Sequence, residues 1–313
     1  MSGPIDPLPR PYAPRRAGRS RFEPIRGLRY HLTTWGDERL ASPARPPLVL
    51  VHGWMDVGAS YQFLVDALDA LEGPVRWILA PDWRGFGQTQ AQAADSYWFP
   101  DYLADLDALL RRLVPDGPID LLGHSMGGNV AMLYAGVRPE RVRRLVNLEG
   151  FGLPRSQPEQ APQRLAQWLD QLQTPARLRP YASLEDVAQR LITSDPRLAP
   201  ERARWLASHW ARREDDGHYA LRADPAHKHV NPVLYRVDEV LACWRRIRAP
   251  LLWVEGELTD TERWWGTRYS RAEFHERLNA VSSVQRERLA GAGHMLHHDQ
   301  PEALAALLQR FLA

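Results

Sequence analysis

Cysteine and lysine are almost absent from this 313-residue sequence, which holds one of each. The single Cys243 excludes an internal disulfide and a zinc centre built from a cysteine cluster, since both need several cysteines. No apolar run reaches the ~20 residues that a membrane-spanning helix needs. The first 20 residues also lack the apolar stretch of a signal peptide, so we expect a cytoplasmic protein with no membrane span.

An excess of charge of either sign is missing too: 40 basic residues face 38 acidic ones, for a formal net charge of +2. A balance this close gives no global attraction for nucleic acid or membrane. Hydrophobic residues make up 44% and charged residues 25%, which is close to the globular average and excludes wholesale disorder. We expect a globular protein with a small-molecule partner and no nucleic acid, and leave its oligomeric state open.

Residues 1–20 contain five prolines and four arginines and show no periodicity. Proline removes backbone donors and arginines repel one another, so this composition predicts a disordered tail. A weak arm for anionic surfaces is the alternative interpretation.

From residue 21 onward, short apolar runs alternate with segments of helical periodicity. Strands are expected at residues 22–25, 29–35, 47–51, 75–80, 119–122, 142–148, 250–254 and 284–289. Helices are expected at residues 61–71, 102–113, 126–135, 271–278 and 301–312. This order predicts an α/β fold, with a mostly parallel eight-stranded sheet and helices on both of its faces.

The alternation stops between residues 151 and 245, where helical periodicity continues without a buried strand. The sequence therefore predicts a core of residues 21–150 and 246–313, interrupted after the sixth strand by a helical cap of residues 151–245. A cap inserted there would cover the carboxyl ends of the strands, where ligands bind in such sheets.

The segment Gly123-His124-Ser125-Met126-Gly127 joins an expected strand to an expected helix. Strand, tight turn and helix are the context that a G-x-S-x-G nucleophile elbow requires. The turn forces the serine into strained backbone angles, and the small residues two positions before and after it avoid clashes between strand and helix. Ser125 is therefore the predicted nucleophile, and a glycine-rich structural turn is the alternative.

Two further loops at strand ends supply what a serine nucleophile needs. Trp54 follows His52-Gly53 after an expected strand, and we assign its backbone N–H and that of Met126 to an oxyanion hole. His294 follows the last expected strand and is the predicted general base.

We expect no metal and no cofactor. A metal site of His294, His297, His298 and Asp299 is a disfavoured alternative, because a loop and a starting helix need not bring these side chains together.

Together these motifs resemble the α/β-hydrolase superfamily, in particular its capped, esterase-like serine hydrolases. The resemblance covers residues 22–313 and includes Asp82-Trp83-Arg84-Gly85-Phe86-Gly87, which matches the D-x-R-G-x-G loop of that family. It implies a Ser–His–acid triad in the chain order serine, acid, histidine. It also implies that the insertion is the lid, the most variable part of these proteins.

The acid is where this sequence departs from the family pattern. The resemblance implies an aspartate three residues after Gly256, but Thr259 stands there and Asp260 follows it. A shift of one residue within a loop is easy, so Asp260 is the first candidate. Glu149, at the end of the preceding strand, is the second, because some members of the family supply the acid from there.

The sequence thus predicts a serine hydrolase that cleaves carboxylic esters through an acyl-enzyme. Ser125 attacks, His294 moves the proton, and Asp260 or Glu149 orients His294. A carbon–carbon bond hydrolase with the same triad and a non-catalytic, ligand-binding pseudo-hydrolase are the alternatives. Tryptophans and leucines in the insertion indicate a partly apolar substrate of medium size.

Overall fold

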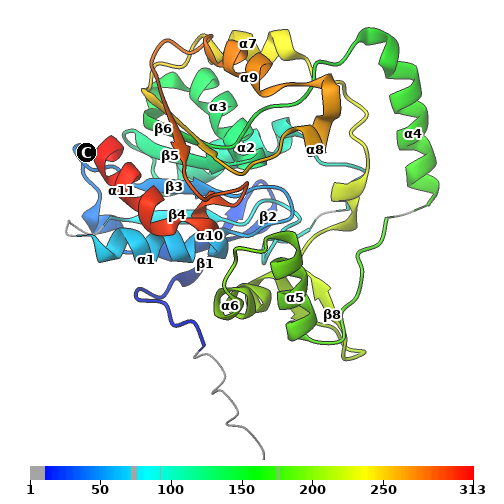
Figure 1. The fold of residues 1–313 in the computed structure, drawn as a ribbon, viewed down its shortest axis with the longest axis horizontal. Coiled ribbons are helices and arrows are strands. Elements are labelled where there is room, and N and C mark those ends of the chain that lie inside the picture. Colours follow the sequence, from blue (N-terminus) through cyan, green and yellow to red (C-terminus); the bar gives the residue numbers. More distant parts are fainter. Residues whose placement is uncertain (1–10, 72–75, 92, 175) are drawn as a thin grey trace, which may run out of the picture.

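In the computed structural model, which describes residues 11–71, 76–91, 93–174 and 176–313, one large sheet forms the centre of the molecule (Figure 1). Its eight strands run in the order β1-β2-β4-β3-β5-β6-β9-β10. They are β1 (Arg19–Ile25), β2 (Leu28–Trp35), β3 (Leu48–Val51), β4 (Ile78–Pro81), β5 (Ile119–His124), β6 (Val142–Leu148), β9 (Leu251–Gly256) and β10 (Val284–Leu289).

The sheet is mostly parallel, as predicted. Only the pairs β1–β2 and β2–β4 are antiparallel, and the pairs from β4 through β3, β5, β6 and β9 to β10 are parallel. Every residue of β3 and of β5 is buried, which explains the continuous apolar sequence of β3. The carboxyl ends of these central strands meet at one edge of the sheet.

Helices cover both faces of the sheet, and this part of the fold prediction is also confirmed. One apolar cluster joins one face to α2 (Phe99–Leu113), α3 (Met126–Val137), α7 (Val237–Trp244) and α9 (Arg271–Leu278). A second cluster joins the other face to α1 (Gln62–Ala70), α10 (Leu296–Asp299) and α11 (Pro301–Leu312). No helix in the described ranges is both long enough and apolar enough to cross a membrane.

The segment between β6 and β9 contains α4 (Ala161–Gln173), α5 (Leu184–Ser194), α6 (Pro200–Trp210) and a hairpin of β7 (Ala211–Arg213) and β8 (Tyr219–Leu221). The helices α5 and α6 and the hairpin share an apolar cluster with Phe63 of α1. The sequence analysis expected no buried strand here and missed this hairpin, because three-residue strands are too short to show alternation.

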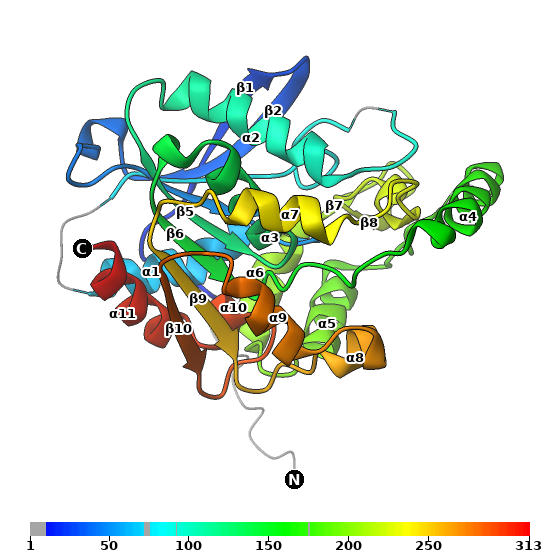
Figure 2. The same cartoon turned by 90° about the horizontal axis from the view of Figure 1, so that it is seen from above.

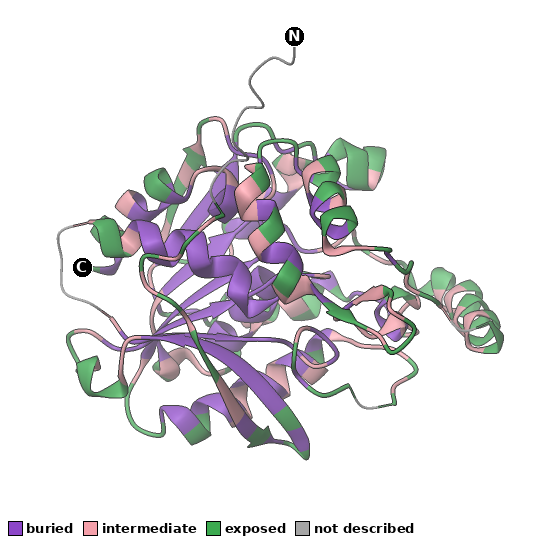
Figure 3. Cartoon of the chain, turned by 90° about the horizontal axis from the view of Figure 1, so that it is seen from below, coloured by how far each residue is buried: buried purple, intermediate pink, exposed green. Residues whose placement is uncertain are grey.

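Helix α4 projects from the rest of the molecule (Figure 2) and has no buried residue. Coloured by burial, its surface is exposed or intermediate throughout, whereas the central sheet is buried (Figure 3). Leu165 and Leu169 on this helix are 45% and 55% exposed.

Helix α7 lies inside the range predicted as cap, yet it packs on α3 with the helices of the sheet. A Cβ built on Gly136 of α3 would lie 2.2 Å from the carbonyl oxygen of Cys243 in α7, so the two backbones touch. The predicted boundary at residue 245 therefore differs from the packing, in which the sheet domain resumes at Val237.

The predicted disordered tail of residues 1–20 is wrong for its second half, while residues 1–10 lie outside the described residues. Asp66 of α1 accepts hydrogen bonds from the Tyr12 hydroxyl and from the backbone N–H groups of Arg15 and Arg16, the latter two at 3.0 and 3.1 Å. β1 then begins at Arg19. A buried carboxylate with several donors fixes a segment that composition alone predicts as disordered.

Candidate active site

Ser125 sits in the sharp turn between β5 and α3, where its φ and ψ are 51° and −117°. The turn is tight enough to need glycine on both sides. A Cβ added to Gly123 would lie 2.3 Å from the Gly127 carbonyl oxygen, and one added to Gly127 would lie 2.2 Å from that of Val51. The strained backbone lifts the Ser125 side chain above the carboxyl end of the sheet, as expected of a nucleophile elbow.

A chain of two hydrogen bonds joins Ser125, His294 and Glu149. The Ser125 hydroxyl lies 3.0 Å from His294 Nε2, and His294 Nδ1 lies 2.8 Å from Glu149 Oε2. The His294 side chain is 29% exposed, whereas that of Glu149 is fully covered. A hydroxyl, an imidazole and a carboxylate in this order are the parts of a nucleophile activated by a general base.

A closed turn after β6 holds Glu149 in place. The Asn147 side chain accepts from the Gly150 N–H at 2.8 Å and donates to the Gly150 carbonyl at 3.2 Å. Glu149 lies between them with a φ of 58°, and its Oε1 accepts from the Gly256 N–H of β9 at 2.6 Å. Because the turn and the neighbouring strand both hold this carboxylate, its free oxygen points at His294.

Asp260, the first candidate for the acid in the sequence analysis, does not contact His294 in the structure. Its Oδ1 accepts from the backbone N–H groups of Glu262 and Arg263 at 3.0 and 3.2 Å, at the start of α8 (Glu262–Trp265). An aspartate at a helix start is drawn to these free donors. Of the two candidate acids, Glu149 is therefore the one that lies beside His294.

Burial disfavours the charged forms of both members of the acid–histidine pair. It lowers the pKa of His294 to about 4 and raises the pKa of Glu149 to about 8. The Gly256 N–H and the Thr259 hydroxyl oppose the rise in the pKa of Glu149. A protonated Glu149 beside a neutral His294 is therefore favoured up to a pH of about 8.

Of the predicted oxyanion residues, Met126 directly follows Ser125, and Trp54 follows Gly53, which lies against Ser125. Met126 is the first residue of α3, and a Cβ added to Gly53 would lie 3.2 Å from the Ser125 Cβ. His52 holds this loop, since its Nε2 accepts from the Trp83 backbone N–H at 2.9 Å and its carbonyl accepts from the Trp83 indole at 2.9 Å. The loop that carries the Trp54 N–H is thus fixed beside the nucleophile.

Two aromatic contacts near the site were missed by the sequence analysis. The Trp264 ring meets the His294 ring edge to face, with centroids 4.6 Å apart. His227 is stacked between Phe86 and Tyr97 at centroid distances of 3.7 and 3.9 Å. In the sequence, the adjacent Trp264 and Trp265 after an expected strand were the only sign of the contact between Trp264 and His294.

A pocket of about 600 Å³ opens beside the nucleophile, and both predicted oxyanion residues line it. Most of its wall is aromatic or apolar, and three arginines, Arg155, Arg164 and Arg268, also line it. Most of these residues come from the strand-end loops and from the insertion between β6 and β9. Such a pocket can enclose a substrate with an apolar body and an acidic group.

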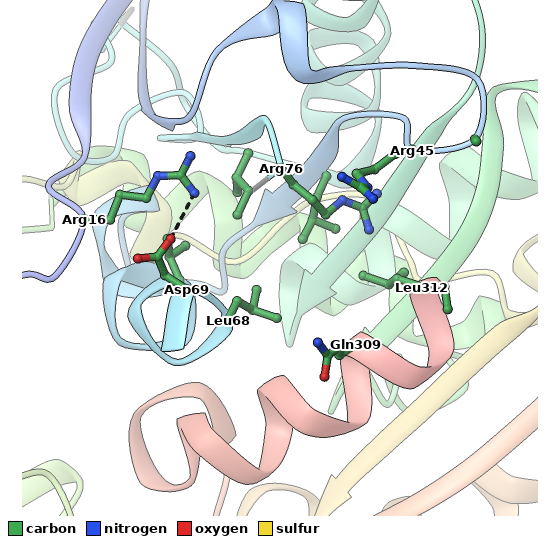
Figure 4. Close-up of a pocket in the computed structure, with 12 residues that line it drawn as sticks. Arg16, Arg45, Leu68, Asp69, Arg76, Gln309 and Leu312 are labelled. Atoms are coloured by element: carbon green, nitrogen blue, oxygen red, sulfur yellow. Dashed lines mark ion pairs between the residues drawn. The ribbon is translucent and has the colours of Figure 1, made fainter. Parts of the chain in front are cut away.

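A second cavity, of about 290 Å³, lies at the opposite edge of the sheet (Figure 4). It is lined by Leu48 and Ile78, the first residues of β3 and β4, and by arginines that include Arg16, which pairs with Asp69 at 3.6 Å. Because ligands of α/β sheets bind at the carboxyl ends of the strands, this cavity is not the candidate active site.

The disfavoured metal cluster of four residues does not form. Asp299 accepts from the Gly293 N–H at 2.7 Å and pairs with Arg197 at 2.9 Å, so its carboxylate is held by a backbone donor and an arginine. His297 instead faces Asp56 and His124, and these three form a group whose ligand atoms lie within 4.8 Å of one another.

Comparisons with known proteins agree with this fold. A family model described as the alpha/beta hydrolase fold matches residues 46–301. The chain is 26% identical to a serine hydrolase-like protein of Danio rerio, over 85% of this chain and 81% of the relative. It is 29% identical to a 3-hydroxybutyrate-oligomer hydrolase of Cupriavidus necator, over 91% of this chain and 92% of the relative.

Among solved structures, the thioesterase domain from the curacin biosynthetic pathway superposes with a TM-score of 0.76 at 26% identity, covering 94% of this chain and 99% of the domain. The eight-stranded order, the elbow and the family match over most of the chain point to the same assignment. The relatives that match along most of the chain support a hydrolase. The chain belongs to the α/β-hydrolase fold family.

Proposed function

We propose that the protein is a serine hydrolase that cleaves carboxylic esters through an acyl-enzyme. One observation carries this proposal: the Ser125 hydroxyl, the His294 imidazole and the Glu149 carboxylate lie in line at 3.0 and 2.8 Å. The pocket beside the nucleophile is large enough for an ester of medium size. These parts are sufficient for acyl transfer without a further group.

In the reactive form, Glu149 is ionised and accepts from the Nδ1–H of His294, which leaves the Nε2 lone pair facing Ser125. Ser125 Oγ attacks the ester carbonyl while His294 takes its proton, and the N–H groups of Trp54 and Met126 stabilise the oxyanion. His294 then gives the proton to the departing alcohol. Water, deprotonated by His294, releases the acid and restores Ser125.

The lining of the pocket supports an ester that also carries an acidic group. Arg155 pairs with the exposed Asp238 at 2.7 Å, while Arg164 and Arg268 donate to backbone carbonyls at 3.2 and 3.4 Å. The relative from Cupriavidus necator is named for its action on 3-hydroxybutyrate oligomers. A short hydroxy-acid oligoester with a terminal carboxylate is the substrate class that we propose first.

A carbon–carbon bond hydrolase with the same residues is the second candidate. A relative from Pseudomonas putida, a 2-hydroxy-6-oxo-2,4-heptadienoate hydrolase, is 34% identical, but over only 34% of this chain. The pseudo-hydrolase alternative depends on the missing aspartate at position 259. Because Glu149 lies at hydrogen-bond distance from His294, the site does not lack a carboxylate.

The test uses a fluorophosphonate probe together with ester substrates of graded length, with and without a terminal carboxylate. We expect the wild-type protein to react at Ser125, and Ser125→Ala to lose both the label and about 10³-fold or more of the ester hydrolysis. Activity that survives Ser125→Ala would overturn the mechanism. Cleavage of a 2-hydroxy-6-oxo-2,4-dienoate without cleavage of any ester would favour the carbon–carbon bond hydrolase.

A further inference from the structure

Three buried side chains from three parts of the fold converge directly beneath the candidate active site. Asp56 lies in the loop after β3, His124 ends β5 next to Ser125, and His297 lies on α10. Each is at most 3% exposed, and their ligand atoms lie within 4.8 Å of one another. The sheet edge, the helix and the loop thus enclose a small polar centre inside an apolar core.

The polar atoms that face this centre have no hydrogen-bond partner among the described residues. Asp56 Oδ1 accepts from the Val57 N–H at 2.8 Å and from the Ser60 hydroxyl, but Oδ2 has no such bond. His124 Nδ1 and both ring nitrogens of His297 also lack partners. Buried polar groups are normally satisfied, so unpaired atoms gathered at one point indicate a missing ligand.

In Asp56 and His124 one polar atom is already hydrogen-bonded, so the other atom is the one left for a ligand. His124 Nε2 lies 2.7 Å from the carbonyl oxygen of His294 and must donate to it, which leaves Nδ1 as a free lone pair. A backbone carbonyl that holds the far nitrogen of a ligating histidine is the usual support around protein metal ions. His297 Nε2 and Asp56 Oδ2 are 3.8 Å apart and can both reach one ion.

We propose that Asp56, His124 and His297 form a binding site for one divalent transition-metal ion of the zinc class. Two imidazoles and a carboxylate are a donor set that Zn²⁺ prefers, and three protein ligands leave its fourth position open. Bonds of about 2.0–2.1 Å require the three ligand atoms to close up slightly around the ion. This goes beyond the sequence analysis, which considered His297 only with residues of its own segment.

The site would inhibit hydrolysis when it is filled, and this consequence rests on the proposed function. His124 donates to the backbone of His294, and the rings of these two histidines are 4.7 Å apart between centroids. Metal bonds of about 2.0–2.1 Å would draw His124 toward the ion and pull on the His294 backbone that it holds. A shift of the His294 imidazole from its position 3.0 Å from the Ser125 hydroxyl would misplace the general base.

The test measures metal binding and activity separately on the full chain after treatment with a chelator. Equilibrium dialysis against ZnCl₂, with metal quantified by mass spectrometry, should give about one ion per chain. The Co²⁺ form should show the intense visible bands of a four-coordinate site. Asp56→Asn and His297→Asn should each weaken Zn²⁺ binding at least tenfold.

The matched control is His218→Asn, because His218 lies 3.4 Å from Asp216 in an exposed pair. This variant should keep the full Zn²⁺ affinity. Fluorophosphonate labelling of Ser125 shows that each variant is folded, and Asp56→Asn serves where His297→Asn does not fold. We expect Zn²⁺ to slow hydrolysis at least tenfold in the wild-type protein and to lose this effect in Asp56→Asn.

Binding of less than 0.1 ion per chain would overturn the proposal. So would binding that persists in both ligand variants but disappears in Glu149→Gln, because the ion would then sit at the triad. One bound ion without inhibition would support the site and refute its effect on hydrolysis. If Ser125 fails to react with the probe, the proposed function fails, while the stoichiometry still decides the metal site.

Discussion

At the scale of single residues, Ser125 and Glu149 share one unusual property. Both have a positive φ, 51° and 58°, and each directly follows one of two adjacent parallel strands, β5 and β6. A residue other than glycine that adopts a positive φ costs free energy, and this conformation persists only where surrounding contacts hold it. Here the turn glycines and the Asn147 side chain hold it, so two reactive groups stand clear of the sheet edge.

The identity of the acid gives the first prediction. Glu149→Gln should lower kcat about 10²–10⁴-fold with little change in KM, because the amide cannot keep His294 in the reactive tautomer. Asp260→Asn is the matched control, since this exposed residue contacts only the start of α8, and it should keep kcat within about twofold. Steady-state kinetics on one ester would decide; the opposite ranking of the two variants would restore Asp260 as the acid.

The raised pKa of Glu149 gives a pH dependence of activity. Because the Glu149–His294 pair holds one proton up to about pH 8, kcat/KM should rise through that pH and then level off. The reactive form needs an ionised carboxylate and a neutral imidazole, which exist together only after this proton has left. A profile of kcat/KM from pH 5 to 10 would show the rise, and a plateau already at pH 6 would contradict it.

The same pair makes stability fall as the pH rises. The pKa of Glu149 is about 8 in the folded state against an ordinary value of 4.5, so between these values the folded state keeps a proton that the unfolded chain has lost. Below about pH 6.5 the lowered pKa of His294 offsets this difference, because the unfolded histidine then holds a proton that the folded one lacks. The free energy of unfolding therefore decreases with pH between about 6.5 and 8. Urea unfolding at pH 6 and pH 9 should show the decrease in wild type and its loss in Glu149→Gln.

At the scale of elements, β6, α9, β10 and α11 have the bounds that the sequence predicts. These elements have strong local signals: apolar runs bounded by turn residues, or regular helical spacing. The β7–β8 hairpin and the segment before β1 have none, because contacts distant in sequence hold them: Tyr181 bridges to Tyr219 of the hairpin, and Asp66 holds the segment through Tyr12. Local pattern could therefore predict the sheet and its helices but not the folding of the insertion.

The contact of α7 with α3 gives a prediction about stability. Gly136→Ala should lower the free energy of unfolding by about 1–3 kcal/mol, although alanine favours helices, because its Cβ would lie 2.2 Å from the Cys243 carbonyl. Val137→Ala, at the adjacent and 37% exposed position, should change it by less than about 0.5 kcal/mol. Denaturant titration measures both, and equal effects would show that α7 packs elsewhere.

At the scale of the whole molecule, Tyr12 connects three regions distant in the sequence. Its hydroxyl donates to Asp66 of α1, and its ring lies 4.9 Å from that of Phe63 in α1 and 5.6 Å from that of Trp205 in α6, between centroids. The segment before β1, a helix of the sheet domain and the insertion are thereby packed as one body.

Removing this side chain should therefore loosen more than its own segment. Tyr12→Ala should lower the free energy of unfolding by about 1–3 kcal/mol, whereas Tyr12→Phe, which keeps the ring contacts, should cost about half as much. Hydrogen exchange of the α6 amides would rise only in Tyr12→Ala. Unchanged exchange there would show that the insertion is held by other contacts.

The candidate site was predictable in part, for reasons that lie in the particular residues. Ser125 and His294 each follow an expected strand within a recognisable motif, so both could be placed without coordinates. Glu149 could be ranked only second, because its position depends on a turn closed by Asn147 and on a donor from Gly256, 107 residues away. The convergence of Asp56, His124 and His297 likewise depends on three separate segments meeting in space.

In the proposed mechanism Glu149 after β6 supplies the carboxylate, so the stretch from Asp260 to Arg268 takes no part in proton transfer. Trp265 and Arg268 of this stretch nevertheless form part of the pocket wall, and Trp264 touches the imidazole. Substrate preference could therefore diverge rapidly here during evolution while turnover chemistry is preserved. A randomised library restricted to these nine positions is, for the same reason, an economical starting point for engineering new selectivity.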